Sequence, residues 1–253
     1  MIPILSENDA RRLDQITVDS GHLSESQLME NAGRESAHFI IDKFKDPFSK
    51  RIIVIAGKGN NGGDGIITHH YLKKYGMDST LMLMSSDDLN RDLFKIYDIM
   101  SESIIFYDNI SELDDFDWVL DALLGIGLKR DISGKYKKLI NYINSHQIVI
   151  SIDIPSGIYT DTGRKGDTSV FADYTLTMGY PKTGLFLNEG SDNSGEIITL
   201  DIGFVSLDKS LVTQNKVIIE DIRQLLTPFT RDMYKYQRGK VITLAGSKGM
   251  SGA

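Results

Sequence analysis

Residues 51–65 read RIIVIAGKGNNGGDG, an apolar run followed at once by a glycine-rich segment. The β-branched residues 51–56 predict a buried strand, because a strand covered on both faces is apolar throughout. A helix is expected to follow over residues 64–75. A strand that leads through glycine into a helix opens a β–α unit, and this unit indicates the fold class.

The alternation of strand and helix continues outward from this unit. Further strands are predicted over residues 79–84, 103–107, 118–121, 148–153, 174–178 and 196–200, with helices over 88–101 and 134–146. Upstream, the pairs Ser6/Asp9 and Ser24/Gln27 have capping-box spacing and open two helices that end near residue 44. We therefore expect a three-layer α/β/α Rossmann-like sandwich, with a mostly parallel sheet and an N-terminal helical extension.

Composition narrows the class of partner. The 253 residues carry 28 Lys and Arg against 35 Asp and Glu, a net charge of −7, which argues against a nucleic-acid-binding face. No apolar run has the length that spans a bilayer, and the N-terminus does not resemble a signal peptide. Cysteine is absent, which excludes disulfides and thiolate chemistry. The sequence predicts a cytoplasmic protein with a small-molecule substrate, no nucleic acid and no membrane partner.

The glycine-rich segment, residues 57–65, has two interpretations. Its first six residues match G-x-G-x-x-G, which favours a dinucleotide-binding dehydrogenase. Asn60 and Asn61 offer amide groups instead, and the charge of Asp64 would oppose a bare phosphate at the mouth of the loop. The plain alternative is a tight turn capped by Asp64.

Two aspartates end predicted strands. Asp121 closes residues 118–121, where a buried charge needs a partner or a cation, and a flexible loop with Gly125 and Gly127 follows. Asp153 closes residues 148–153 before a turn at Pro155, which makes it a candidate acid or base. Each aspartate alone could simply serve its own turn, but the carboxyl ends of parallel strands share one rim.

Two weaker features lie nearby. Lys182, in the segment YPKTG, follows the strand over residues 174–178, and a surface loop is the favoured interpretation. His69 and His70 fall in the first crossover helix without further ligands at helical spacing, so packing or surface roles are expected for both.

Together these motifs resemble the NAD(P)H-hydrate epimerase family, also called the YjeF N-terminal domain. The resemblance covers about residues 5–225 and rests on MENAG (29–33), NNGGDG (60–65), DALLGIG (121–127), DIPSG (153–157) and PKTGL (181–185). It implies an enzyme that interconverts the R and S forms of hydrated NADH and NADPH. The inversion would proceed by loss and return of the hydroxyl or by reversible ring opening.

The resemblance also implies site residues, a cofactor and an assembly. The cofactor is potassium, the assembly is a homodimer, and Asp153 is the candidate acid/base. The implied potassium ligands are Asn61, Asp121 and Ser156. The implied substrate contacts are Asn60, Asn61, Gly62, Gly63, Asp64, Gly125, Ile126, Gly127, Leu128, Lys129, Arg130, Asp131 and Asp153.

The last residues carry a second resemblance. GKVITLAGSKGMSGA (239–253) is similar to the opening of an NAD(P)H-hydrate dehydratase domain. We therefore expect an epimerase domain over residues 1–227, and a linker with the incomplete start of a dehydratase domain over 228–253, as in a fragment of a bifunctional protein. A Rossmann dehydrogenase and a non-catalytic binding module of the same fold remain the alternatives. The dehydrogenase would transfer hydride, and the module would not need all three polar strand ends.

Overall fold

The computed structural model describes residues 2–84, 104–107, 116–207 and 214–216. Residues Pro3–Asn215 form one compact unit, and the fold and site below belong to it. The helix expected over residues 88–101 and the dehydratase-like segment 239–253 lie outside the described residues.

A seven-stranded sheet forms the centre of this unit. Its order is β4-β3-β2-β5-β6-β7-β8, and every pairing is parallel. The strands are β2 (Arg51–Ala56), β3 (Asp78–Leu83), β4 (Ile104–Phe106), β5 (Trp118–Ala122), β6 (Ile148–Ile152), β7 (Tyr174–Met178) and β8 (Glu196–Leu200). A separate pair consists of β1 (Ile2–Ile4) and β9 (Gln214–Lys216).

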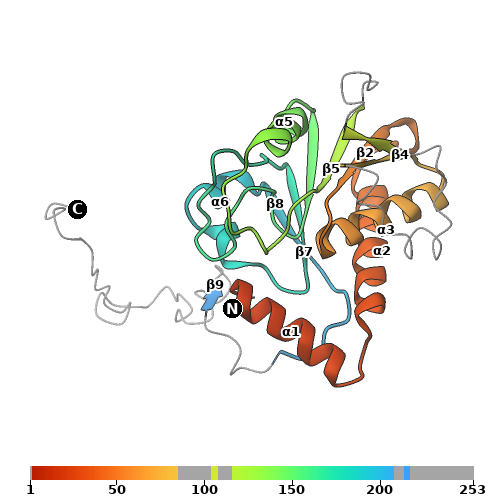
Figure 1. Ribbon diagram of the computed structural model, residues 1–253. Coiled ribbons are helices and arrows are strands. Elements are labelled where there is room, and N and C mark those ends of the chain that lie inside the picture. Colours follow the sequence, from red (N-terminus) through yellow and green to blue (C-terminus); the bar gives the residue numbers. More distant parts are fainter. Residues whose placement is uncertain (1, 85–103, 108–115, 208–213, 217–253) are drawn as a thin grey trace, which may run out of the picture. The chain divides into compact units, whose positions relative to one another are not determined.

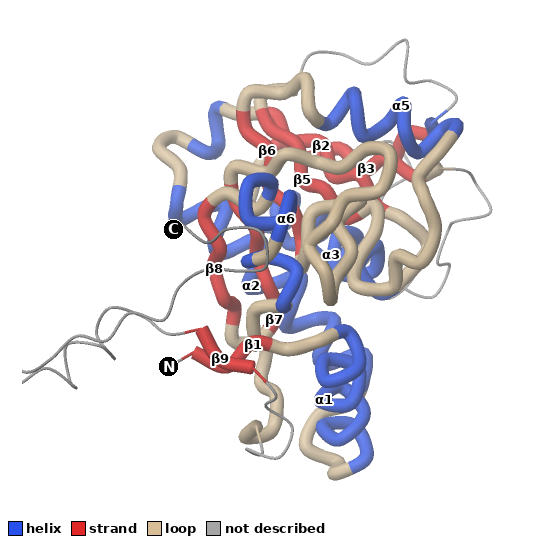
Figure 2. Tube along the Cα trace, turned by 90° about the vertical axis from the view of Figure 1, so that its left-hand side faces the viewer, coloured by secondary structure: helices blue, strands red, loops and turns tan. Residues whose placement is uncertain are grey.

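Helices cover both faces of the sheet (Figure 1). The helices are α1 (Glu7–Asp19), α2 (Glu25–Lys43), α3 (Asn60–Lys74), α5 (Gly134–Ile143) and α6 (Asn188–Asn193), with 3₁₀ turns at η1 (Pro47–Ser49) and η5 (Thr183–Phe186). Helices α2 and α3 pack on one face, and α5 lies on the other. Helix α1 stands apart from these layers, beyond one end of the strands (Figure 2).

The alternating side chains of β2 show why both faces must be covered. Ile52 and Val54 pack into one core with α2 and α3, whereas Ile53 and Ile55 pack into a second core with α5. All four are fully buried. Successive side chains of a strand point to opposite faces, so one apolar run supplies both cores. The predicted three-layer sandwich is confirmed.

The sheet order places a crevice next to β2. From β2 the chain adds β3 and β4 on one side, then crosses to add β5, β6, β7 and β8 on the other. Ligands of open α/β sheets bind outside the carboxyl ends of the strands at such a switch point. Here that point lies between the segments that follow β2 and β5.

The helix after β2 begins earlier than its sequence suggests. It starts at Asn60 with Gly59 at its N-cap, so Asp64 is not the cap. The glycines keep the helix close to its neighbours: a Cβ on Gly62 would meet the carbonyl oxygen of Gly57, and one on Gly65 would meet the Ala122 side chain. Close packing, more than turn formation, accounts for this glycine run.

Candidate functional site

A large pocket lies at the switch point, with a volume of about 1420 Å³. The segments after β2 and β5 form one wall, Asp153 and Lys182 contribute from the ends of β6 and β7, and α1 and α2 close it from outside. Among the implied substrate contacts, those that line the pocket are Asn60, Asn61, Asp64, Gly125, Ile126, Gly127, Leu128, Lys129, Arg130, Asp131 and Asp153. Gly62 and Gly63 are buried in helix packing.

The segment after β5 is anchored along its length. Thr160 donates a hydrogen bond to the carbonyl of Ile126 (3.0 Å), and the Tyr159 hydroxyl donates to Asp131 (3.1 Å). Lys129 lies 3.6 Å from Glu7 of α1. This segment and α1 therefore form one rim that carries the cations Arg11, Lys129 and Arg130.

Asp121 is completely buried at the end of β5. Its carboxylate accepts hydrogen bonds from the hydroxyl and amide of Ser156 (2.6 and 2.9 Å), the hydroxyl of Ser151 (2.8 Å) and the amide of Leu123 (3.2 Å). Burial raises the pKa of Asp121, and these hydrogen bonds oppose that effect. All four donors are neutral, so a charged carboxylate here lacks a balancing cation.

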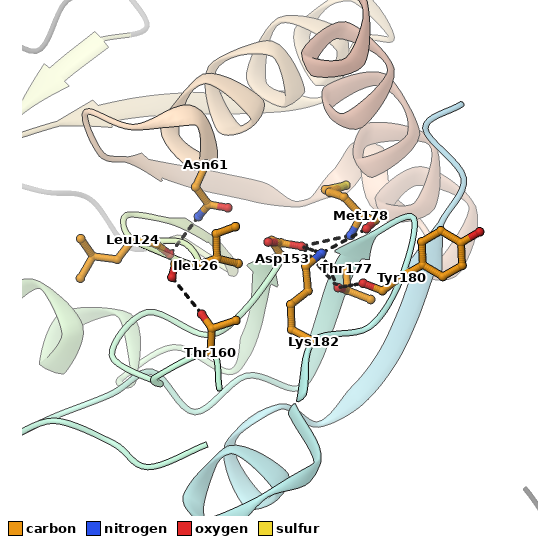
Figure 3. A network of polar contacts seen from close by, with 9 residues as sticks. All are labelled: Asn61, Leu124, Ile126, Asp153, Thr160, Thr177, Met178, Tyr180 and Lys182. Atoms are coloured by element: carbon orange, nitrogen blue, oxygen red, sulfur yellow. Dashed lines mark hydrogen bonds and ion pairs between the residues drawn. The ribbon is translucent and has the colours of Figure 1, made fainter. Parts of the chain in front are cut away.

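Two of the three implied potassium ligands, Asn61 and Ser156, contact one backbone carbonyl, and the third, Asp121, bonds to Ser156. Asn61 donates a hydrogen bond to the Leu124 carbonyl oxygen through its side-chain amide (3.0 Å; Figure 3). The Ser156 hydroxyl contacts the same oxygen (3.1 Å) and also bonds to Asp121. A hard cation takes oxygen ligands, which these amide, hydroxyl, carboxylate and carbonyl groups offer. The residues therefore fit a potassium ion. In the described part of the chain, no cluster of three His, Cys, Asp or Glu side chains offers a competing metal site.

Asp153 has an unusual backbone. Its φ of 65° lies in the left-handed region, which few residues other than glycine adopt. Its Oδ1 accepts hydrogen bonds from the Met178 amide (3.2 Å) and the Thr177 hydroxyl (3.3 Å), both on β7. The carboxylate thus bonds to the neighbouring strand and not to its own turn at Pro155, and the turn-serving interpretation of Asp153 is wrong.

Lys182 is the residue that the sequence interpretation misplaced. Its side chain is only 4% exposed and makes an ion pair with Asp153 Oδ1 (Figure 3). Its ammonium also donates to the Thr177 hydroxyl (3.2 Å) and the Met178 carbonyl (3.1 Å). The prediction that Lys182 lies in a surface loop is therefore wrong. The position of YPKTG just after the end of β7 was the sequence feature that could have indicated a place in the site.

The N-terminal segment secures Lys182 from outside. Leu5 donates a backbone hydrogen bond to Pro181 (2.9 Å) and accepts one from Thr183 (2.9 Å). These two bonds flank Lys182 in a parallel bridge. Ser6 and Asp9 then form the predicted capping box of α1, so the same segment leads directly into that helix.

Two of the other carboxyl groups that line the pocket, Asp14 and Asp64, have raised pKa values. Burial, followed by the negative charges of Asp153 and Asp14, raises the pKa of Asp64 well above its usual value. Asp14, on α1, keeps a solvent-exposed side chain, yet the surrounding protein raises its pKa to about 6. The pocket therefore combines an ion pair with two carboxyl groups that bind protons more tightly than usual.

His69 has a structural role, as expected. It is 1% exposed and its Nδ1 lies 2.8 Å from the Ser79 hydroxyl in the core. It does not line the pocket.

Known proteins are similar to this chain in fold and in sequence. The crystal structure of the yeast protein ynu0 (YNL200c) matches with a TM-score of 0.64 and 20% identity, over 78% of this chain and 87% of that one. The NAD(P)H-hydrate epimerase of Elusimicrobium minutum is 34% identical over 220 residues, which are 81% of this chain and 96% of that protein.

Longer relatives match as well. The bifunctional NAD(P)H-hydrate repair enzyme Nnr of Dictyoglomus turgidum is 32% identical over 259 residues, covering 99% of this chain and 50% of that enzyme. The chain thus spans about half the length of such relatives. None of the described helices is long and apolar enough to cross a membrane. Residues 25–184 match the family described as YjeF-related protein N-terminus, and the chain belongs to that family.

Proposed function

We propose that this chain is an NAD(P)H-hydrate epimerase, which interconverts the R and S forms of hydrated NADH and NADPH. Relatives that carry this name match nearly their whole length to this chain. The observation that carries the proposal is Asp153: Oδ1 is held by Lys182 and β7, while Oδ2 accepts no hydrogen bond from the described residues of this pocket. A carboxylate fixed on one side and free on the other is suited to proton transfer.

The pocket can hold the proposed substrate. Its volume exceeds the few hundred to about 1000 Å³ of ordinary small-molecule sites, as a dinucleotide requires. The cationic rim with Arg11, Lys129 and Arg130 would bind the pyrophosphate. The nicotinamide hydrate would then lie towards Asp64, Asp153 and Lys182.

Inversion at the hydrated carbon requires only proton transfer and addition of water. Loss of the hydroxyl needs a proton on the departing oxygen, and the ring nitrogen stabilises the resulting cation. Water then adds to the other face and gives up a proton, for which Asp153 Oδ2 is the candidate acceptor. Reversible ring opening needs the same two transfers at different atoms.

Potassium is part of the proposal. Asn61, Asp121, Ser156 and the Leu124 carbonyl would hold it, and the bound ion would balance the buried charge of Asp121. The segments after β2 and β5 meet at Leu124, so these residues fix the two segments of this pocket wall to each other.

We further propose a cytoplasmic homodimer, in which α1 and α2 offer apolar surface. A domain boundary near residue 227 stays a prediction, because it lies outside the described residues.

Incubation of purified R hydrate with the protein tests the proposed activity. Chromatography should then show a mixture of both epimers, with no oxidised nicotinamide. Oxidised product with a carbonyl co-substrate would indicate the dehydrogenase instead. Unchanged R hydrate, with the protein folded and potassium present, would favour a binding module.

A further inference from the structure

The proposed inversion needs a second proton carrier. Asp153 Oδ1 is held by Lys182, Met178 and Thr177, so only one oxygen of this carboxylate can reach the substrate. Protonating the departing hydroxyl on one face and deprotonating water on the other calls for a group elsewhere in the pocket. Besides Asp153, the carboxyl side chains that line the pocket are Asp14, Glu25, Asp64 and Asp131. Asp131 accepts a hydrogen bond from Tyr159 and Glu25 accepts one from Asn60 (3.4 Å), which leaves Asp14 and Asp64 as the candidates for this proton.

Solvent access distinguishes Asp14 from Asp64. Asp64 is half-buried on α3, and burial raises its pKa well above its usual value. Asp14 is exposed at the mouth of the pocket, where it can exchange its proton with water. A general acid works best with a pKa near the working pH, and the pKa of Asp14 is raised to about 6.

The fold holds Asp14 in place through α1. The Leu5 backbone pairs around Lys182, and the Ser6 capping box starts the helix two residues later. The Glu7 amide also donates to Asp161 (2.6 Å). The start of α1 is thus fixed to the segments that form the site, and Asp14 faces the pocket two turns further on. The side chain of Asp14 makes no hydrogen bond with the described residues, which leaves its carboxyl group available to a ligand.

We propose that Asp14 is a further catalytic residue of this pocket, the acid that protonates the departing hydroxyl. This inference rests on the proposed epimerase function. The carbon–oxygen bond breaks, its electron pair stays on oxygen, and the proton of Asp14 completes the departing water. After water adds to the other face, Asp153 takes the released proton, and exchange with solvent restores both groups. No oxidant or reductant is consumed.

The charged neighbours of Asp14 set the pH range of this step. Partial desolvation by the surrounding protein raises the pKa of Asp14 most strongly, and the charges of Asp153 and Glu25 raise it further, while Lys182 and Arg11 lower it. The negative charge of Asp14 in turn contributes to the raised pKa of Asp64, after burial and the charge of Asp153. Activity that requires protonated Asp14 should fall tenfold per pH unit above about 6.

The test compares pH profiles of inversion for the wild type, Asp14→Asn and the control Asp19→Asn. Asp19 is an aspartate on the same helix and does not line the pocket. At pH 6, Asp14→Asn should be about a hundredfold slower, a usual effect of losing a general acid. The two rates should converge near pH 8, and Asp19→Asn should follow the wild type.

The outcomes separate this inference from the function beneath it. If the wild type inverts the substrate and Asp14→Asn shows the same rate and the same fall in rate above pH 6, the role of Asp14 is overturned. The proposed epimerase function then still stands. If the fall in rate above pH 6 disappears in Asp64→Asn instead, the general acid is Asp64, and the role of Asp14 is again overturned. A folded wild type without inversion contradicts the proposed function itself. Thermal unfolding of each variant shows whether a slow rate reflects misfolding.

Discussion

Lys182 and Asp153 form a buried ion pair, with side chains that are 4% and 13% exposed. Asp153 directly follows β6, and Lys182 follows β7. Backbone hydrogen bonds of Leu5 with Pro181 and Thr183 hold the segment that carries the lysine. Asp153 adopts a left-handed φ to take part. Strained backbone of this kind persists where the surrounding structure enforces it, often at functional sites.

The pair predicts separate effects on stability and turnover. Asp153→Asn should tolerate the left-handed backbone, because asparagine adopts it readily. It leaves Lys182 buried without an anion, which should cost roughly 3 kcal/mol, and turnover should fall about a hundredfold. In Asp153→Asn/Lys182→Met, much of the stability should return while turnover stays low. Denaturant unfolding and single-turnover inversion on one preparation measure both. Full inversion by a folded Asp153→Asn protein would end the assignment of Asp153.

The potassium site predicts a matched pair of variants. Ser151 and Ser156 each donate a hydroxyl hydrogen bond to Asp121, but only Ser156 is an implied ligand. Potassium, compared with tetramethylammonium, should raise the melting temperature of the wild type by a few degrees, because it binds only the folded state. Ser156→Ala should lose this gain and Ser151→Ala should keep it. Equal melting temperatures of the wild type in both salts would argue against the site.

The glycine-rich segment predicts a contrast between two neighbours. A Cβ at Gly62 would lie 1.9 Å from the Gly57 oxygen, whereas one at Gly59 meets nothing within 4 Å. Gly62→Ala should therefore destabilise the protein by roughly 1–3 kcal/mol or more. Gly59→Ala should cost under about 1 kcal/mol, as at other helix N-caps. Urea unfolding measures the loss of stability in each variant. Equal losses in Gly62→Ala and Gly59→Ala would mean that the close contact between Gly62 and Gly57 does not determine the stability of this segment.

His69 predicts part of the acid sensitivity of the fold. Burial, with a smaller effect of Lys73 and His70, lowers its pKa to about 3. In the unfolded chain a histidine binds its proton near pH 6.5, so acidification favours unfolding between about pH 6.5 and 3. Asp14 acts in the opposite sense below about pH 6, because its folded pKa is raised.

Comparison with His69→Asn isolates this contribution. Relative to the variant, the wild type should lose up to about 1.4 kcal/mol per pH unit below pH 6.5. The difference is read from unfolding curves at several pH values. Parallel pH dependences would show that His69 binds protons equally in both states.

The sequence predicted what local patterns control. Both capping boxes form as their spacing suggests, and residues 51–56, 174–178 and 196–200 are strands with the expected bounds. The start of α3 was four residues off, because contacts with Gly57 and Met29 explain the glycines and local turn chemistry does not. Lys182 was misplaced because its ion pair with Asp153 and its backbone bridge to Leu5 join residues that are distant in sequence. The sequence likewise could not place Asp14 in the pocket, because that depends on where α1 lies in the fold.

Inversion of the hydrate is tested most directly by a coupled assay. Mixed R and S hydrates of NADH are supplied with a dehydratase specific for the S form, with potassium present. The dehydratase alone should restore only the S fraction to NADH. Adding this protein should restore the R fraction too, whereas the Asp153→Asn variant should leave most of it over the same time. If the R fraction remains unconsumed with folded wild-type protein, the proposed epimerase function is contradicted.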